Sequence, residues 1–159
     1  MLFHLPKFPA EIRVSHLNAR LNEQRKKIAQ ATSSRLELLQ LMQQLVKEAK
    51  ARKKNDQKIF VLDFKGDIQA SAADTLREEI TLILATAKAG HDRVVVRLES
   101  PGGMVHGYGL AAAQLVRLRD AGFNLTICVD KVAASGGYMM ACIANQIIAA
   151  PFAVVGSIG

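Results

Sequence analysis

Apolar and polar positions divide this chain into two regions that meet near residue 58. Over residues 15–54, Leu, Ala, Gln, Glu, Lys and Arg predominate, Gly and Pro are missing, and apolar residues recur at roughly helical spacing. The pair Ser33-Ser34 predicts a division of this stretch into two helices. We therefore expect a basic helical linker over residues 1–57 and a differently built region over residues 58–159.

The second region alternates short apolar runs with amphipathic stretches. Predicted strands cover 59–64, 93–98, 124–129 and, more briefly, 147–150; predicted helices cover 72–89, 104–120 and 135–145. Ser71 is the expected N-cap of the first of these helices. Strands that alternate with helices predict βαβ units, and hence an α/β fold with a largely parallel sheet. Residues 153–159 resemble another strand beginning, so we expect the sheet to be incomplete at its C-terminal side.

Composition changes this picture mainly through charge. The chain of 159 residues carries a net charge of +7, but residues 1–58 hold 13 basic and 5 acidic residues (+8), whereas residues 59–159 hold 8 and 9 (−1). The basic charge therefore belongs to the helical region, where it indicates a solvated stalk, a partner helix or attraction to anionic lipid head groups. No aromatic interleaving or recognition motif supports nucleic-acid binding.

Other compositional features exclude several classes of protein. No apolar run reaches the roughly 18 residues of a membrane span, and residues 1–9 are too short and too rich in Pro for a secretory signal. Cys128 and Cys142 are interpreted as small core residues. No disulfide framework, metal site or cofactor is predicted from them.

The candidate chemistry lies in two glycine loops, each between a predicted strand and a predicted helix. The second loop, Ala133-Ala134-Ser135-Gly136-Gly137, places one Ser at the head of an apolar helix, as many hydrolases place a nucleophile. The first, Glu99-Ser100-Pro101-Gly102-Gly103, would meet it beyond the carboxyl ends of the strands and supply an oxyanion-hole amide. Taken singly, Ser135 also fits a plain N-cap, and Gly102-Gly103 a tight turn.

A base for Ser135 is harder to find. His106 is the histidine nearest the predicted pocket, but its place early in a helix favours packing or solvent exposure. His91 lies in a predicted turn, and His4 and His16 lie in the N-terminal segment, which makes a Ser-His-Asp triad unfavourable. Lys131, four residues before Ser135, is expected to make a loop contact. A nucleotide-loop interpretation of residues 102–109 is weak, because these residues match neither the P-loop nor the dinucleotide fingerprint.

Four blocks of residues 58–159 resemble the signal peptide peptidase family of membrane-associated bacterial serine proteases, specifically its SohB branch. They are 60–66 (FVLDFKG), 98–109 (LESPGGMVHGYG), 129–142 (VDKVAASGGYMMAC) and 150–159 (APFAVVGSIG). The resemblance implies a ClpP/crotonase-like fold and peptide-bond hydrolysis by a Ser-Lys dyad. It makes Ser135 the nucleophile, and Gly136 and Gly103, or Gly102 in place of Gly103, the oxyanion donors.

The same resemblance implies features that this sequence does not contain. The family's general-base Lys lies past Gly159, and its membrane anchor precedes the basic region, so we expect the chain to be a fragment that is inactive alone. Expected partners are peptide substrates, an anionic membrane surface and further copies of the chain. The bacterial inner membrane is the implied location, with its side open. Two alternatives remain: a non-catalytic ClpP/crotonase-like binding scaffold and an acyl-CoA-processing crotonase-type protein.

Overall fold

The computed structural model describes residues 12–54 and 56–158. Residue contacts place the described residues up to Asp56 in one compact unit and those from Gln57 on in another. Each unit is described by itself.

The first unit is a helical hairpin, whose helices are α1 (Leu17–Thr32) and α2 (Arg35–Lys54). The predicted division at Ser33-Ser34 is confirmed. Ser34 begins α2 with a reciprocal cap, because its backbone N–H donates to Glu37 Oε2 (2.7 Å) and its Oγ accepts from the Glu37 N–H (3.4 Å). No helix in the described part of the chain is long and apolar enough to cross a membrane.

The second unit is built on a four-stranded parallel sheet. Its strands lie in the order β1 (Ile59–Lys65), β2 (Arg93–Glu99), β3 (Asn124–Val129) and β5 (Gln146–Ala149). A two-stranded parallel sheet pairs β4 (Val132–Ala134) with β6 (Val154–Gly156). The predicted α/β class with a parallel sheet is confirmed.

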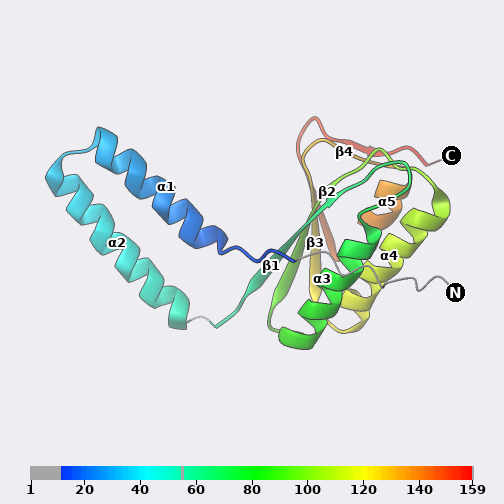
Figure 1. Cartoon of the computed structure of the whole chain (residues 1–159), viewed down its shortest axis with the longest axis horizontal. Coiled ribbons are helices and arrows are strands. Elements are labelled where there is room, and N and C mark those ends of the chain that lie inside the picture. Colours follow the sequence, from blue (N-terminus) through cyan, green and yellow to red (C-terminus); the bar gives the residue numbers. More distant parts are fainter. Residues whose placement is uncertain (1–11, 55, 159) are drawn as a thin grey trace, which may run out of the picture. The chain divides into compact units, whose positions relative to one another are not determined.

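Helices α3 (Ala73–Thr86), α4 (Val105–Asp120) and α5 (Gly136–Ala141) lie on the same side of the large sheet (Figure 1). Alternate strand residues face them, so that Leu62, Val96 and Ile127 stand in register on three neighbouring strands and are buried. This face forms the core with the inner sides of α3 and α4. Because the strands are parallel, their carboxyl ends lie at one edge of the sheet. The first glycine loop follows β2 at this edge, and the second follows β3 by way of β4.

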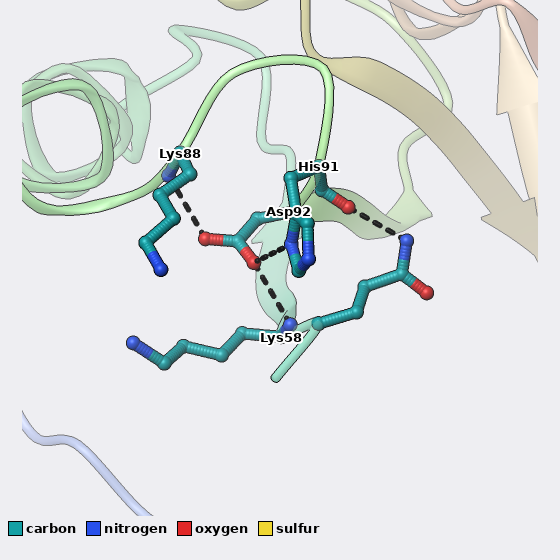
Figure 2. Close-up of polar contacts among 5 residues, drawn as sticks. Lys58, Lys88, His91 and Asp92 are labelled. Carbon is teal, nitrogen blue, oxygen red and sulfur yellow. Dashed lines mark hydrogen bonds and ion pairs between the residues drawn. The ribbon is translucent and has the colours of Figure 1, made fainter. Parts of the chain in front are cut away.

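The opposite edge of the sheet, where the strands start, is held by a buried carboxylate. The side chain of Asp92 is 1% exposed, and it accepts hydrogen bonds from the backbone N–H groups of Lys58 (2.9 Å) and Lys88 (2.9 Å). His91 Nδ1 lies 3.3 Å from the same carboxylate. Figure 2 shows the carboxylate between these three groups, which come from the residue before β1, the segment after α3 and the turn before β2. The backbone hydrogen bonds lower the pKa of Asp92 to about 2, because they stabilise its charged form.

Four details of the sequence interpretation need correction. Ser71 does not cap α3: the N-cap is Ala72, and Ser71 Oγ donates to Asp67 Oδ2 (2.6 Å) instead. Helix α5 ends at Ala141 rather than at residue 145, and residues 132–134, interpreted as loop, form β4. Cys142 is exposed and therefore no core residue.

Candidate active site

Ser135 occupies the sharp turn between β4 and α5, and its backbone is strained. Its φ of 50° and ψ of −117° lie outside the regions that residues with a Cβ normally adopt. Such a conformation costs roughly 1–3 kcal/mol and is found mainly where surrounding structure and function require it. Hydrogen bonds hold the turn from both sides, since the Ser135 N–H donates to Gly156 O (2.8 Å) and its carbonyl accepts from the Met139 N–H (2.9 Å).

The Ser135 side chain is available for chemistry. The residue is exposed, while Gly136 and Gly137 after it are buried. Although Ser135 stands at the N-cap position of α5, its side chain makes no capping hydrogen bond with any described residue. The plain N-cap interpretation is therefore wrong for this serine.

The first glycine loop lies directly against the second. Gly102 has a φ of +91°, and a Cβ added there would lie 2.6 Å from Ser135 Cβ and 2.8 Å from Ala134 O. Only glycine permits both that backbone conformation and that approach. Ser100 pairs with β4, the strand that ends just before Ser135. The Ser100 N–H donates to Val132 O (2.9 Å), and the Ser100 carbonyl accepts from the Ala134 N–H (3.0 Å). The structure thus brings together the two loops that the sequence singled out.

The backbone amides of the two loops differ in their partners. The Gly102 N–H donates to Ser100 Oγ (3.1 Å). Within the described chain, the N–H groups of Gly103 and Gly136 form no hydrogen bond. Gly103 is exposed, and it follows the glycine that touches Ser135. Both amides without partners therefore belong to the two loops that meet at the exposed Ser135 hydroxyl.

The other titratable candidates play no part in this arrangement. His106 is exposed on the first turn of α4, and no hydrogen bond joins it to Ser135 among the residues described. Lys131 makes the expected loop contact, because its Nζ lies 3.1 Å from both carboxylate oxygens of Glu99. No cluster of His, Cys, Asp and Glu suited to a metal ion occurs within residues 12–54 and 56–158.

Two buried residues beside the loops were not assigned a role from the sequence. Ser100 and Tyr108 are both fully buried, and their hydroxyl oxygens lie 2.6 Å apart. Ser100 lies within the motif of residues 98–109, but a Ser that follows a strand is too common to indicate a role by itself. Only the fold shows that Tyr108, on α4, reaches it.

Comparison with known protein families identifies the family of this chain. Residues 6–115 match the N-terminal part of peptidase family S49, and residues 117–159 match peptidase family S49. The chain belongs to peptidase family S49.

Relatives within the family S49 match between 42% and 67% of this chain. The chain is 62% identical over 107 residues to a probable protease SohB of Buchnera aphidicola subsp. Acyrthosiphon pisum, which covers 67% of this chain and 32% of the relative. It is 64% identical over 101 residues to the probable protease SohB of Haemophilus influenzae, covering 64% and 28%. Protease 4 of Salmonella typhi is 41% identical over 66 residues, covering 42% and 11%. The chain thus spans about a third of the length of the SohB relatives.

Among solved structures, the chain is similar to a mutant of ClpP1 from Listeria monocytogenes. The TM-score is 0.38 at 14% identity, over 58% of this chain and 50% of that one. This likeness is too low to carry an argument, and the site is interpreted from its own geometry.

Proposed function

We propose that this S49 chain supplies the nucleophile and the oxyanion hole of a membrane-associated serine endopeptidase. The observation that carries the proposal is the exposed hydroxyl of Ser135 on a strained turn, pressed against Gly102. A strained backbone at an exposed serine favours a functional role, because an ordinary cap would adopt a relaxed backbone. The similarity to proteins named as proteases supports the same reaction.

In the proposed reaction, Ser135 Oγ attacks the carbonyl carbon of the scissile peptide bond. The carbonyl oxygen becomes negatively charged and accepts hydrogen bonds from the Gly136 and Gly103 N–H groups. Because these donors are held by the backbone, no reorganisation is needed as the charge develops. The C–N bond then breaks, the amine leaves with a proton, and water hydrolyses the acyl-enzyme in a second step.

A base must accept the Ser135 proton, because a free hydroxyl is barely ionised at neutral pH. Lys131 is unsuited to this role, since its ammonium group is engaged by Glu99. We assign the base to a Lys outside this sequence, as the resemblance to the signal peptide peptidase family implies. Burial would keep such a Lys neutral by disfavouring its charged form.

The proposed membrane association rests on the helical hairpin. Residues 12–54 carry 11 basic and 3 acidic residues, and apolar side chains such as Leu21 and Ile28 are more than half exposed. A surface of this kind suits anionic lipid head groups. Co-sedimentation with vesicles that contain phosphatidylserine, but not with pure phosphatidylcholine vesicles, is the expected result, and binding should fall as salt is added. Equal binding to both lipids would remove this part of the proposal. Peptide substrates and assembly into a homo-oligomer belong to the proposal as well.

The nucleophile is tested in the full native protein that contains this chain. A fluorophosphonate probe should label the wild type and the exposed-serine control Ser34→Ala equally, whereas Ser135→Ala should abolish both labelling and peptide turnover. Circular dichroism establishes that each variant is folded. Turnover that survives in Ser135→Ala would refute the nucleophile assignment.

Two other results would point to the alternative functions. A wild-type protein that neither hydrolyses peptides nor reacts with the probe would be a binding scaffold. Saturable binding of coenzyme A, with no loss in Ser135→Ala, would favour an acyl-CoA-processing protein.

A further inference from the structure

Three successive hydrogen bonds, two of them buried and the third part-buried, connect the loops around Ser135. The Gly102 N–H donates to Ser100 Oγ (3.1 Å), Ser100 Oγ lies 2.6 Å from Tyr108 Oη, and Tyr108 Oη donates to Asp67 O (2.7 Å). The direction of the middle bond follows from the ends. Because the single Tyr108 hydroxyl proton goes to a carbonyl, which can only accept, Ser100 must donate to Tyr108. The hydroxyl groups of Ser100 and Tyr108 then each donate one hydrogen bond and accept one.

The hydroxyl chain is packed tightly between glycines. A Cβ on Gly66 would overlap both hydroxyl oxygens, and a Cβ on Gly137 would lie 2.8 Å from Ser100 O. The Tyr108 ring lies against Gly136, where an added Cβ would come within 2.7 Å of Tyr108 Cβ. The two side chains therefore contact the β1–α3 loop, the Gly102 loop and the turn that carries Ser135.

We propose that Ser100 and Tyr108 are positioning residues for the oxyanion hole, acting through the hydroxyl chain from Gly102 to Asp67. The inference rests on the proposed peptidase function. Engaging the Gly102 N–H holds the plane of the peptide group between Pro101 and Gly102, from which the Gly103 peptide follows directly. The neighbouring Gly103 N–H is thereby left as the donor of this loop, and its direction is set by the buried hydroxyls.

The hydrogen bond from the Gly102 N–H to Ser100 Oγ favours Gly103 over Gly102 as the oxyanion donor. If Gly102 were the donor, its N–H would have to leave Ser100 Oγ, and a fully buried hydroxyl would lose a partner during catalysis. Donation by Gly103 requires no such change. A preorganised donor is the one that contributes most to stabilising the transition state.

The test uses Tyr108→Phe in the full native protein, because it removes one oxygen and keeps the ring that packs against Gly136. Active sites are first counted by burst titration, so that unfolded protein does not affect the rate. We expect kcat per active site to fall about 10- to 100-fold with KM changed less than about 3-fold, since a donor misplaced by ~1 Å costs up to ~10²-fold. Ser100→Ala, which removes the acceptor of the Gly102 N–H, should have at least the same effect.

Ile80→Val is the matched control. Ile80 is fully buried on α3 and carries no polar group, so this variant weakens the core without touching the hydroxyl chain. Its kcat per active site should equal that of the wild type. A second measurement is independent of turnover: hydrogen exchange over residues 101–104 should be faster in Ser100→Ala than in Ile80→Val.

The outcomes separate the two proposals. Wild-type kcat in a folded Tyr108→Phe variant would overturn the positioning role while leaving the peptidase intact, as would unchanged exchange over residues 101–104. If the wild type shows no turnover that depends on Ser135, the proposed function fails and the positioning role falls with it, whatever the exchange data. If Ser100→Ala does not fold, Tyr108→Phe alone decides.

Discussion

Replacing Gly102 by Ala tests the close approach of the two loops most directly. The added Cβ meets two separate penalties. A residue with a Cβ in a left-handed conformation, here at φ +91°, costs ~1–2 kcal/mol. The new atom would also lie 2.6 Å from Ser135 Cβ and 2.8 Å from a carbonyl oxygen, and overpacking of this kind costs typically ~1–3 kcal/mol.

Gly90 provides the control that separates these penalties. Its φ is +74°, but a Cβ there would have no neighbour within 4 Å. Gly90→Ala therefore meets only the conformational cost of ~1–2 kcal/mol. The stiffer unfolded chain offsets ~0.4–1 kcal/mol of that cost, which leaves a destabilisation of roughly 0–1.6 kcal/mol. Gly102→Ala adds the steric term, so its total is roughly 1–4.6 kcal/mol.

Urea-induced unfolding measures the free energy of unfolding of the wild type, Gly90→Ala and Gly102→Ala, and hence the destabilisation caused by each substitution. The difference between the variants should be about 1–3 kcal/mol, and peptide turnover should be lost only in Gly102→Ala, because only there is Ser135 displaced. If Gly102→Ala is no less stable than Gly90→Ala, the two loops do not touch as described. Wild-type turnover in Gly102→Ala would refute the geometry of the site even if the stability changed.

Three further variants probe features away from Ser135. The pKa of Asp92 is about 2 in the folded protein and 3.8 for an ordinary Asp, so its contribution to the free energy of unfolding is complete above pH 3.8 and is lost as the pH falls toward 2. The free energy of unfolding of Asp92→Asn should not show this loss. If the wild type and Asp92→Asn lose stability equally between pH 3.8 and pH 2, the prediction is wrong. Gly109→Ala should raise the free energy of unfolding by roughly 0.5–1 kcal/mol, since the Cβ enters open space within α4; a lower melting temperature would be the contrary result. Ser34→Ala should cost ~0.5–2 kcal/mol of α2 stability, seen as faster hydrogen exchange in its first turn, because the reciprocal cap with Glu37 is lost; unchanged exchange would show that the cap is unimportant.

The sequence predicted most of the elements because their patterns are local. The apolar run that begins at Ile59 and the amphipathic stretch that ends at Asp120 each specify an element without distant partners. Strand β4 was missed because three residues form a strand only by pairing with Val154–Gly156, far along the chain. Helix α5 was predicted too long, because residues 142–145 are apolar enough to continue it. Instead, Asn145 exchanges hydrogen bonds with Leu125 through its N–H (2.9 Å) and Oδ1 (2.8 Å), which requires the chain to leave the helix and join the sheet.

The candidate site was predictable to a similar extent. Short motifs indicated Ser135 and the Gly102-Gly103 loop, since small residues beside a serine at a strand-to-helix turn form a local pattern. The proposed choice of the Gly103 amide over the Gly102 amide was not predictable, because it depends on hydrogen bonds that connect residues 67, 100 and 108. Three common residue types at those spacings carry no recognisable signal in the sequence.

The strained backbone of Ser135 has an evolutionary consequence. Glycine would adopt φ 50° without penalty, so Ser135→Gly should make the protein more stable than the wild type while removing the hydroxyl. Replacement of Ser135 by glycine would therefore stabilise the fold while removing the hydroxyl that the proposed hydrolysis requires. A lineage released from the need for catalysis would be expected to drift toward glycine at this position, whereas a lineage that keeps serine there accepts a less stable protein in exchange for its activity.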